Sequence, residues 1–104
     1  MSSELEKKFR DAMIEIYERG LKECKYNASR FIQMVREIGA LATAKAFLAS
    51  QKPFKGLTKL FEMNRLDLSV ERVVAYEDEF KELFTQQERD EARRRLDELG
   101  YKDR

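Results

Sequence analysis

Few residues in this sequence have the type and spacing that catalysis requires. Its 104 residues include one cysteine, Cys24, and no histidine. A lone thiol has no imidazole beside it to act as a base, and it cannot form an internal disulfide. We therefore interpret Cys24 as a small structural residue near the end of a helix. The same composition excludes zinc sites built from cysteine and histidine.

Carboxylates are the remaining candidates for chemistry. Asp67 and Glu71 lie four residues apart and could act as a pair, but we expect Asp67 to accept hydrogen bonds from the backbone or from Arg65 at a helix start. The acidic run 77–79 is consecutive, whereas calcium loops space their ligands at alternate positions, so we interpret it as a solvated turn. The sequence also lacks a Walker motif and a Gly-x-Ser-x-Gly elbow. We predict no enzyme activity, no cofactor, no bound metal and no small-molecule substrate.

Basic residues are concentrated in the middle of the chain. The net charge is only +1, but residues 27–66 carry seven basic and two acidic side chains, whereas residues 67–104 carry eight and twelve. A basic surface can bind nucleic acid through phosphate contacts, although the same lysines could simply keep an alanine-rich pair of helices in solution. The candidate nucleic-acid contacts are Arg30, Lys45, Lys52, Lys55, Lys59 and Arg65, with Arg36 beside them.

A helix-turn-helix is one way in which this basic region could bind DNA. Gly39 lies between two short predicted helices, as the turn of that motif requires. Lys45, however, stands where the second helix of the motif usually carries an inward apolar residue, and the connection is short. The pattern therefore favours phosphate contacts over base recognition.

Apolar and aromatic residues offer a different contact surface. The sequence has more aromatic bulk near its ends than so small a core needs, and an exposed apolar patch marks a protein interface. The alternative is that these side chains are simply part of the core. The candidate interface residues are Ile14, Tyr17, Phe80, Phe84 and Tyr101.

Helical periodicity occupies the sequence up to residue 64. Ser3 and Glu6 have the spacing of a capping box, which predicts a first helix with an apolar stripe as far as about residue 24. A cap at Asn27 predicts a second helix that ends at Gly39. The expected buried face of this second helix consists of Ala28, Phe31, Ile32, Val35 and Ile38.

Two further helices are predicted before the chain changes direction. Residues 40–50 are rich in alanine and predict a closely packed third helix. Pro53 can occupy the first position of a fourth helix, and Asn64 tolerates the left-handed conformation that ends it. Its expected apolar residues are Phe54, Leu57, Leu60 and Phe61.

The segment 64–71 predicts a buried corner around which the helices assemble. Its members are Arg65, Leu66, Asp67, Leu68, Ser69 and Glu71, with Ser69 as the cap of a fifth helix. Residues 73–76 could be extended on propensity alone, but a lone strand would have no partner, so we predict a helix. Thr85 and Glu88 form a second capping box before a final helix of about residues 86–99, ended by Gly100.

These elements predict one compact all-α domain, a single bundle of about six short helices over residues 1–104. Residues 27–101 form its expected core, and the helix of residues 1–24 can lie at the periphery. No apolar run approaches the roughly 18 residues of a membrane span, and the first residues lack the order of a secretory signal. We therefore expect a cytoplasmic protein that has no membrane partner.

Several short patterns resemble a family of small, uncharacterised bacterial helical domains. They are Phe31-x-x-Met34-Val35, Gly39, the alanine-rich run 40–48, Gly56-x-x-x-Leu60, the segment 65–71, and Leu83-Phe84-Thr85. The resemblance covers residues 26–101 and leaves the first helix outside. Ser69 stands where threonine is more usual, and Phe61 where an aromatic residue such as tryptophan is expected. Such domains occur alone or attached to larger, sometimes nuclease-like proteins, which implies a bacterial or phage setting.

Together these observations favour contact with another macromolecule over turnover of a substrate. We predict a non-enzymatic helical interaction module that binds a protein partner or self-associates into a homo-oligomer. The alternative is a nucleic-acid-binding accessory protein that uses the basic region 30–65.

Overall fold

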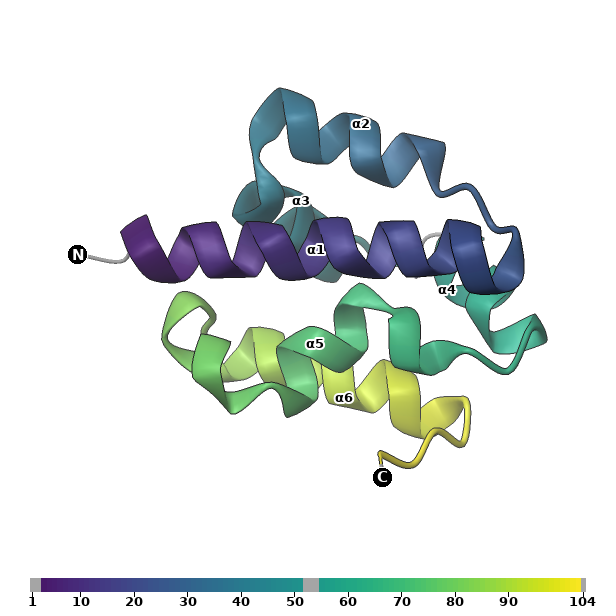
Figure 1. Ribbon diagram of the computed structural model, residues 1–104. Coiled ribbons are helices and arrows are strands. Elements are labelled where there is room, and N and C mark those ends of the chain that lie inside the picture. Colours follow the sequence, from purple (N-terminus) through teal and green to yellow (C-terminus); the bar gives the residue numbers. More distant parts are fainter. Residues whose placement is uncertain (1–2, 52–54, 104) are drawn as a thin grey trace.

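Six α-helices account for most of the chain (Figure 1). The computed structural model describes residues 3–51 and 55–103, except the side chain of Ser3. The helices are α1 (Ser3–Cys24), α2 (Ser29–Ile38), α3 (Ala40–Ala49), α4 (Lys55–Glu62), α5 (Val70–Tyr76) and α6 (Gln86–Glu98). Two 3₁₀-helices, η1 (Leu66–Leu68) and η2 (Asp78–Leu83), flank α5, and no strand occurs in the described residues. The predicted all-α bundle of about six helices is therefore confirmed.

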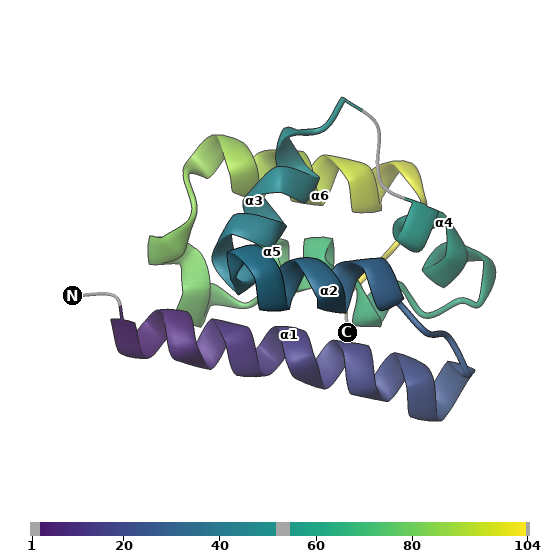
Figure 2. The ribbon, with the colours of Figure 1, turned by 90° about the horizontal axis from the view of Figure 1, so that it is seen from above.

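The helices form two groups around α1. α2 packs against α3 on one side of α1, and α5 packs against α6 on the other (Figure 1). Seen from above, α3 lies between α1 and α6 and contacts both (Figure 2). The radius of gyration is 12.6 Å, which matches a compact domain of about this length.

α1 is part of the core and not a peripheral element. Phe9 and Met13, one turn apart on its apolar stripe, are both fully buried. The ring of Phe9 makes edge contacts with Phe80 and Phe84, with centroids 5.2 and 5.3 Å away. This corrects two expectations, because α1 cannot be peripheral, and Phe80 and Phe84 are core residues that form no exposed interface.

Most of the predicted helix ends have the expected chemistry. Gly39 has a positive φ of 92° and Asn64 one of 58°, as the sequence predicts for the ends of α2 and α4. The hydroxyl of Ser69 accepts a hydrogen bond from the backbone N–H of Arg72, so it caps α5, which is helical and not extended. Asn27 is not the cap of α2, because its side chain instead accepts a hydrogen bond from the hydroxyl of Tyr17.

Of the remaining predictions of helix starts, one is confirmed and two concern positions that the structure does not describe. The predicted capping box of α6 is complete, since Glu88 and Thr85 each accept a hydrogen bond from the other's backbone N–H. The expected cap at Ser3 and the expected helix start at Pro53 lie outside the described side chains and residues.

The predicted corner is buried, as expected. Leu66 and Leu68 pack with Leu57 and Leu60 of α4 and with Leu96 of α6. This second apolar cluster packs α4 and η1 against α6. α4 lies near the C-terminal end of α1 (Figure 1).

Candidate functional site

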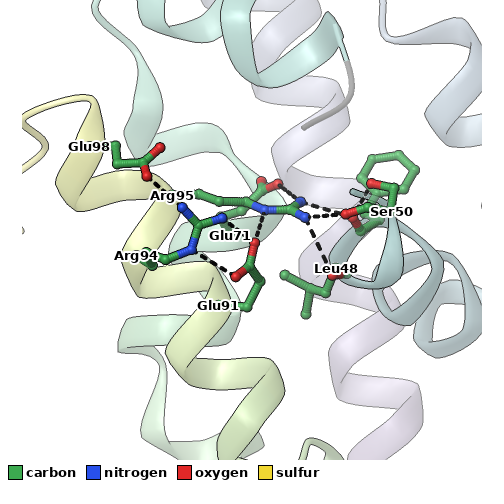
Figure 3. A network of polar contacts seen from close by, with 8 residues as sticks. Leu48, Ser50, Glu71, Glu91, Arg94, Arg95 and Glu98 are labelled. Carbon is green, nitrogen blue, oxygen red and sulfur yellow. Dashed lines mark hydrogen bonds and ion pairs between the residues drawn. The ribbon is translucent and has the colours of Figure 1, made fainter. Parts of the chain in front are cut away.

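Among the described residues, the most buried charged group belongs to Arg95 on α6, whose side chain is only 1% exposed. Its guanidinium donates to the carbonyl oxygens of Phe47, Leu48 and Ser50 at 2.9, 3.4 and 2.6 Å, and to the carboxylate of Glu91 at 2.6 Å (Figure 3). The last carbonyls of a helix have no partner within it, so Arg95 caps the C-terminal end of α3 from a different helix. We call Arg95, these acceptors and Glu71 the Arg95 centre.

Glu71 completes this centre from α5. Its side chain is 4% exposed, and one of its oxygens lies 3.8 Å from a guanidinium nitrogen of Arg95 (Figure 3). Burial raises the pKa of Glu71, while the charge of Arg95 opposes that rise. A buried carboxyl with a raised pKa is a common mark of a catalytic acid, so the space around it decides its role.

The space beside Glu71 is too small for a substrate. Glu71 lines a cavity of about 50 Å³, whose other walls include Tyr26, Phe31, Leu57 and Leu68. An apolar cavity of about 150 Å³ is needed to hold benzene. The carboxyl of Glu71 therefore has a structural partner in Arg95 and no room for a reacting molecule.

Asp67 and Glu71 do not form a working pair, because each has a different basic partner. Asp67 accepts hydrogen bonds from Arg65 at 3.1 Å, which confirms the expected role of Asp67. Arg65 also donates to Glu23 at 2.7 Å, and bonds from Arg19 and Arg65 lower the pKa of Glu23 to about 2. Among the described residues, no cluster of three or more acidic or thiol side chains could hold a metal ion.

Two of the predicted nucleic-acid contacts are used within the fold. Lys45 donates to Glu88 at 2.7 Å, and its ammonium lies over the ring of Phe84, 5.2 Å from the centroid. Arg65 is paired with the acidic residues described above. Both side chains are therefore already paired with carboxylates of the same chain.

The other predicted contacts are dispersed. Lys55 and Lys59 are exposed on α4 and have no ion pair among the described residues. Arg30 is exposed at the start of α2 and has an interaction of its own, and Lys52 lies outside the described residues. Among these predicted contacts, the described structure thus offers one short basic row, on α4, and not a continuous basic face.

The remaining predicted interface residues are only half-exposed. Ile14 and Tyr17 pack against the core from α1. Tyr101 contacts the ring of Tyr76, with centroids 6.0 Å apart, and donates from its hydroxyl to Asp103 at 2.7 Å. These side chains offer less free apolar surface than the sequence suggests.

Among the large apolar side chains of the described residues, the one with the highest exposed fraction lies elsewhere, at the junction of α2 and α3. Ile38 is 51% exposed, which corrects its expected place on the buried face of α2. It lines a groove of about 510 Å³ with Glu6, Lys7 and Arg10 of α1, residues 39–42, and Lys45. We call this feature the α2–α3 groove.

The charges along the α2–α3 groove are uneven. Lys7 and Arg10 are exposed and take part in no ion pair or hydrogen bond within the described part of the chain. Glu6 is engaged in an interaction of its own, and Lys45 is paired with Glu88. The groove therefore combines exposed apolar surface with two basic side chains that no described residue neutralises.

A second groove is less suited to a partner. It has a volume of about 650 Å³ and lies between Phe61 and the C-terminal segment 99–103. Phe61 is 45% exposed, but most of the charged side chains around it already have an ion-pair partner. Arg72, for example, donates to Asp103 at 3.0 Å and also pairs with Glu77. Only Lys102 in this groove has no described ion pair.

The sequence analysis did not identify the residues that define the Arg95 centre and the α2–α3 groove. Arg95 lies three residues after Ala92 and four before Leu99, which places it on the apolar stripe of α6, and that position was a readable sign of burial. Ile38 carries no such sign, because it continues the stripe of α2 and is exposed only since the helix ends there and the chain turns at Gly39. Lys7 and Arg10 look like ordinary surface residues in the sequence.

The chain was also compared with known proteins. No protein-family model matches it, and neither a curated protein nor a solved structure does. No helix in the described part has the length and apolar content to cross a bilayer. The geometry of the α2–α3 groove is therefore the main basis on which a function can be proposed.

Proposed function

We propose that this protein is a non-enzymatic docking module that binds a partner protein through the α2–α3 groove. The observation that carries this proposal is the 51% exposure of Ile38 in a groove of about 510 Å³. Exposed apolar side chains in a concave surface gain free energy when a partner removes them from water. Leu41 and Ala42 extend the apolar surface on the other side of Gly39.

The absence of catalytic chemistry is the second part of the proposal. The buried carboxyl of Glu71 is held next to Arg95, and Asp67 is held by Arg65. Glu71 faces a cavity of only about 50 Å³, and Asp67, which borders the second groove of about 650 Å³, is already hydrogen-bonded to Arg65. A role in binding uses the surface that these contacts leave exposed.

Photo-crosslinking in the source cells tests the proposal. A photoreactive amino acid is placed at Ala42, in the groove, or at Thr58, an exposed residue of α4 outside it. We expect Ala42 to form an adduct with one other protein and Thr58 to form none. Equal adducts at both positions, or none at Ala42, would contradict the proposal, and an adduct between two copies would show self-association instead.

A matched pair of variants then tests affinity with the purified partner. Ile38→Asp places a charge in the groove, whereas Phe61→Asp does the same at an equally exposed apolar residue elsewhere. We expect Ile38→Asp to weaken binding by about tenfold or more, since burying one apolar side chain contributes about 1.5–3 kcal/mol. Phe61→Asp should leave affinity unchanged. Removal of residues 1–24 is not a usable test, because Phe9 and Met13 belong to the core.

Nucleic-acid binding is the alternative function, and its support is Lys55 and Lys59 on one exposed face of α4. If this alternative holds, the chain binds random duplex DNA at low salt, and the Lys55→Gln/Lys59→Gln variant loses that binding. Retention on the DNA that does not change in the variant would exclude α4 as the contact.

A further inference from the structure

The α2–α3 groove has a basic rim on one side. Lys7 and Arg10 are three residues apart on α1, so they lie on the same face of that helix, and both line the groove. Neither has a described ion pair, whereas Lys45, on the α3 side of the groove, is neutralised by Glu88 at 2.7 Å. The positive charge that remains for a partner is therefore on the α1 side.

The opposite side of the groove, at the start of α3, also carries positive charge. Residues 39–42, which line it, include the first turn of α3, and this turn has neither an acidic residue nor a side-chain cap. The N-terminal end of a helix carries a partial positive charge, which here no side chain of the turn offsets. This feature adds to the charge of Lys7 and Arg10 and has the same sign.

The floor between these two sides is apolar, and the backbone groups of Gly39 are hydrogen-bonded within the fold. The carbonyl of Gly39 accepts hydrogen bonds from the hydroxyl and the backbone N–H of Thr43, at 2.7 and 3.0 Å, and its N–H donates to Val35. A partner can therefore gain little from hydrogen bonds to Gly39 itself. It gains apolar contact with Ile38, Leu41 and Ala42, and polar recognition comes from the rim and from the free N–H groups of the first turn of α3.

We infer that the partner presents a short segment in which an apolar side chain is flanked by carboxylates. The apolar side chain would pack on Ile38, and the carboxylates would pair with Lys7 and Arg10. This inference rests on the proposed docking function and specifies the chemistry of the partner. Charge complementarity of this kind chooses partners mainly by excluding segments of like charge and by raising the association rate.

Selection from a library of random short peptides tests the inference without assuming a sequence. The full chain is immobilised, and peptides are selected on the wild type and counter-selected on Ile38→Asp. We expect the enriched peptides to carry aspartate or glutamate next to leucine, isoleucine, phenylalanine or methionine. One synthetic copy of an enriched peptide then serves as the probe for affinity measurements.

Charge reversal provides the matched control. Lys7→Glu/Arg10→Glu should weaken binding of the selected peptide by about tenfold, and the remaining affinity should depend less on salt. Lys55→Glu/Lys59→Glu changes the net charge by the same amount at two exposed residues outside the groove and should leave the affinity nearly unchanged. The neutral variant Lys7→Gln/Arg10→Gln and a thermal melt of each variant separate lost contacts from lost folding.

The outcomes distinguish this inference from the proposed function. Enriched peptides that are neutral or basic, or a Lys7→Glu/Arg10→Glu variant that binds normally, would overturn the inference while Ile38-dependent binding would still support docking. Failure to enrich any peptide on the wild type over Ile38→Asp would overturn both. Displacement of the peptide by random duplex DNA, or a dimer in sedimentation that Ile38→Asp abolishes, would assign the groove to nucleic acid or to a second copy.

Discussion

The Arg95 centre and the α2–α3 groove use the same kinds of side chain in opposite ways. In the Arg95 centre, a guanidinium is almost fully buried, and carbonyls of α3 and two carboxylates surround it. In the groove, Lys7 and Arg10 are exposed without a described partner beside a half-exposed isoleucine. The two regions adjoin opposite ends of the same helix, α3.

The difference separates charged side chains that stabilise the fold from charged side chains that a proposed partner could contact. A buried charge must be compensated inside the fold, because its desolvation is costly, and the compensated group is then unavailable to a ligand. An exposed charge costs little to leave unpaired and contributes little to folding. We therefore expect substitutions at the C-terminal end of α3 and at its N-terminal end to affect different measurements.

The largest expected effect is at Arg95. Arg95→Met removes the cap from α3 and leaves the buried Glu71 without a counter-ion, so we expect a loss of about 3–5 kcal/mol in the free energy of unfolding. The control is Arg94→Ala on the exposed face of α6, which should cost no more than about 1 kcal/mol. Urea denaturation followed by circular dichroism measures both. A small effect of Arg95→Met would refute the central role of this side chain.

Replacing both buried charges sharpens the same point. The double variant Arg95→Met/Glu71→Leu removes the guanidinium together with the carboxylate that it compensates, so we expect it to recover at least about 1 kcal/mol relative to Arg95→Met alone. If the double variant is no more stable than the single one, then the lost cap of α3, and not the orphaned carboxylate, dominates the cost.

Two isoleucines of α2 compare the buried and exposed regions directly. Ile32 is 7% exposed and Ile38 is 51% exposed. Ile32→Ala should cost about 2–4 kcal/mol, whereas Ile38→Ala should change stability by about 0.5 kcal/mol or less. Chemical denaturation of the two variants measures this contrast, and similar losses would mean that Ile38 is not a surface residue.

The buried carboxyl of Glu71 makes a distinct prediction about pH. Burial raises the pKa of Glu71 in the folded chain above its ordinary value of 4.5. The folded chain then holds the proton more tightly than the unfolded chain, so this contribution to stability is fully present below the ordinary pKa and is lost as pH rises through the raised one.

A glutamine at position 71 is uncharged at every pH, as the protonated carboxyl of Glu71 is. Relative to the wild type, Glu71→Gln should therefore become more stable as pH rises from about 4, below the ordinary pKa, towards about 8. Thermal melts across this range measure the change, with the exposed Glu82→Gln as the control. A parallel course for wild type and Glu71→Gln would contradict the raised pKa.

The smallest expected effect on the free energy of unfolding comes from substitutions in the basic rim of the α2–α3 groove. Lys7→Gln/Arg10→Gln should change the free energy of unfolding by about 0.5 kcal/mol or less, because both side chains are exposed. The same variant should weaken binding of an acidic partner, so it separates the two regions most cleanly. A large loss of stability would show that these cations support the fold.

The helices and several of their ends could be predicted because their signals are local. Ser69, Thr85 with Glu88, and the left-handed residues Gly39 and Asn64 each act on a backbone only a few residues away. The buried corner was predictable for a similar reason, since alternating Leu66 and Leu68 must leave water on any helical fold.

The proposed binding surface could not be predicted, because it depends on which helices pack together. Phe80 and Phe84 are buried only since α1 places Phe9 between them, and Lys45 is neutralised by a residue 43 positions away. Exposure of Ile38 likewise follows from the turn at Gly39 and not from its neighbours in sequence. Long-range packing therefore decides which of several similar residues reach the surface.

The position of Arg95 also has a consequence for synthesis on the ribosome. The carbonyls that it caps belong to residues 47, 48 and 50, and Glu71 precedes it by a further segment of the chain. A nascent polypeptide that has exposed α1 to α5 but not yet α6 would have to bury a carboxylate with no cation to offset it. We therefore expect the burial of Glu71 beside Arg95 to occur only after α6 has left the exit tunnel.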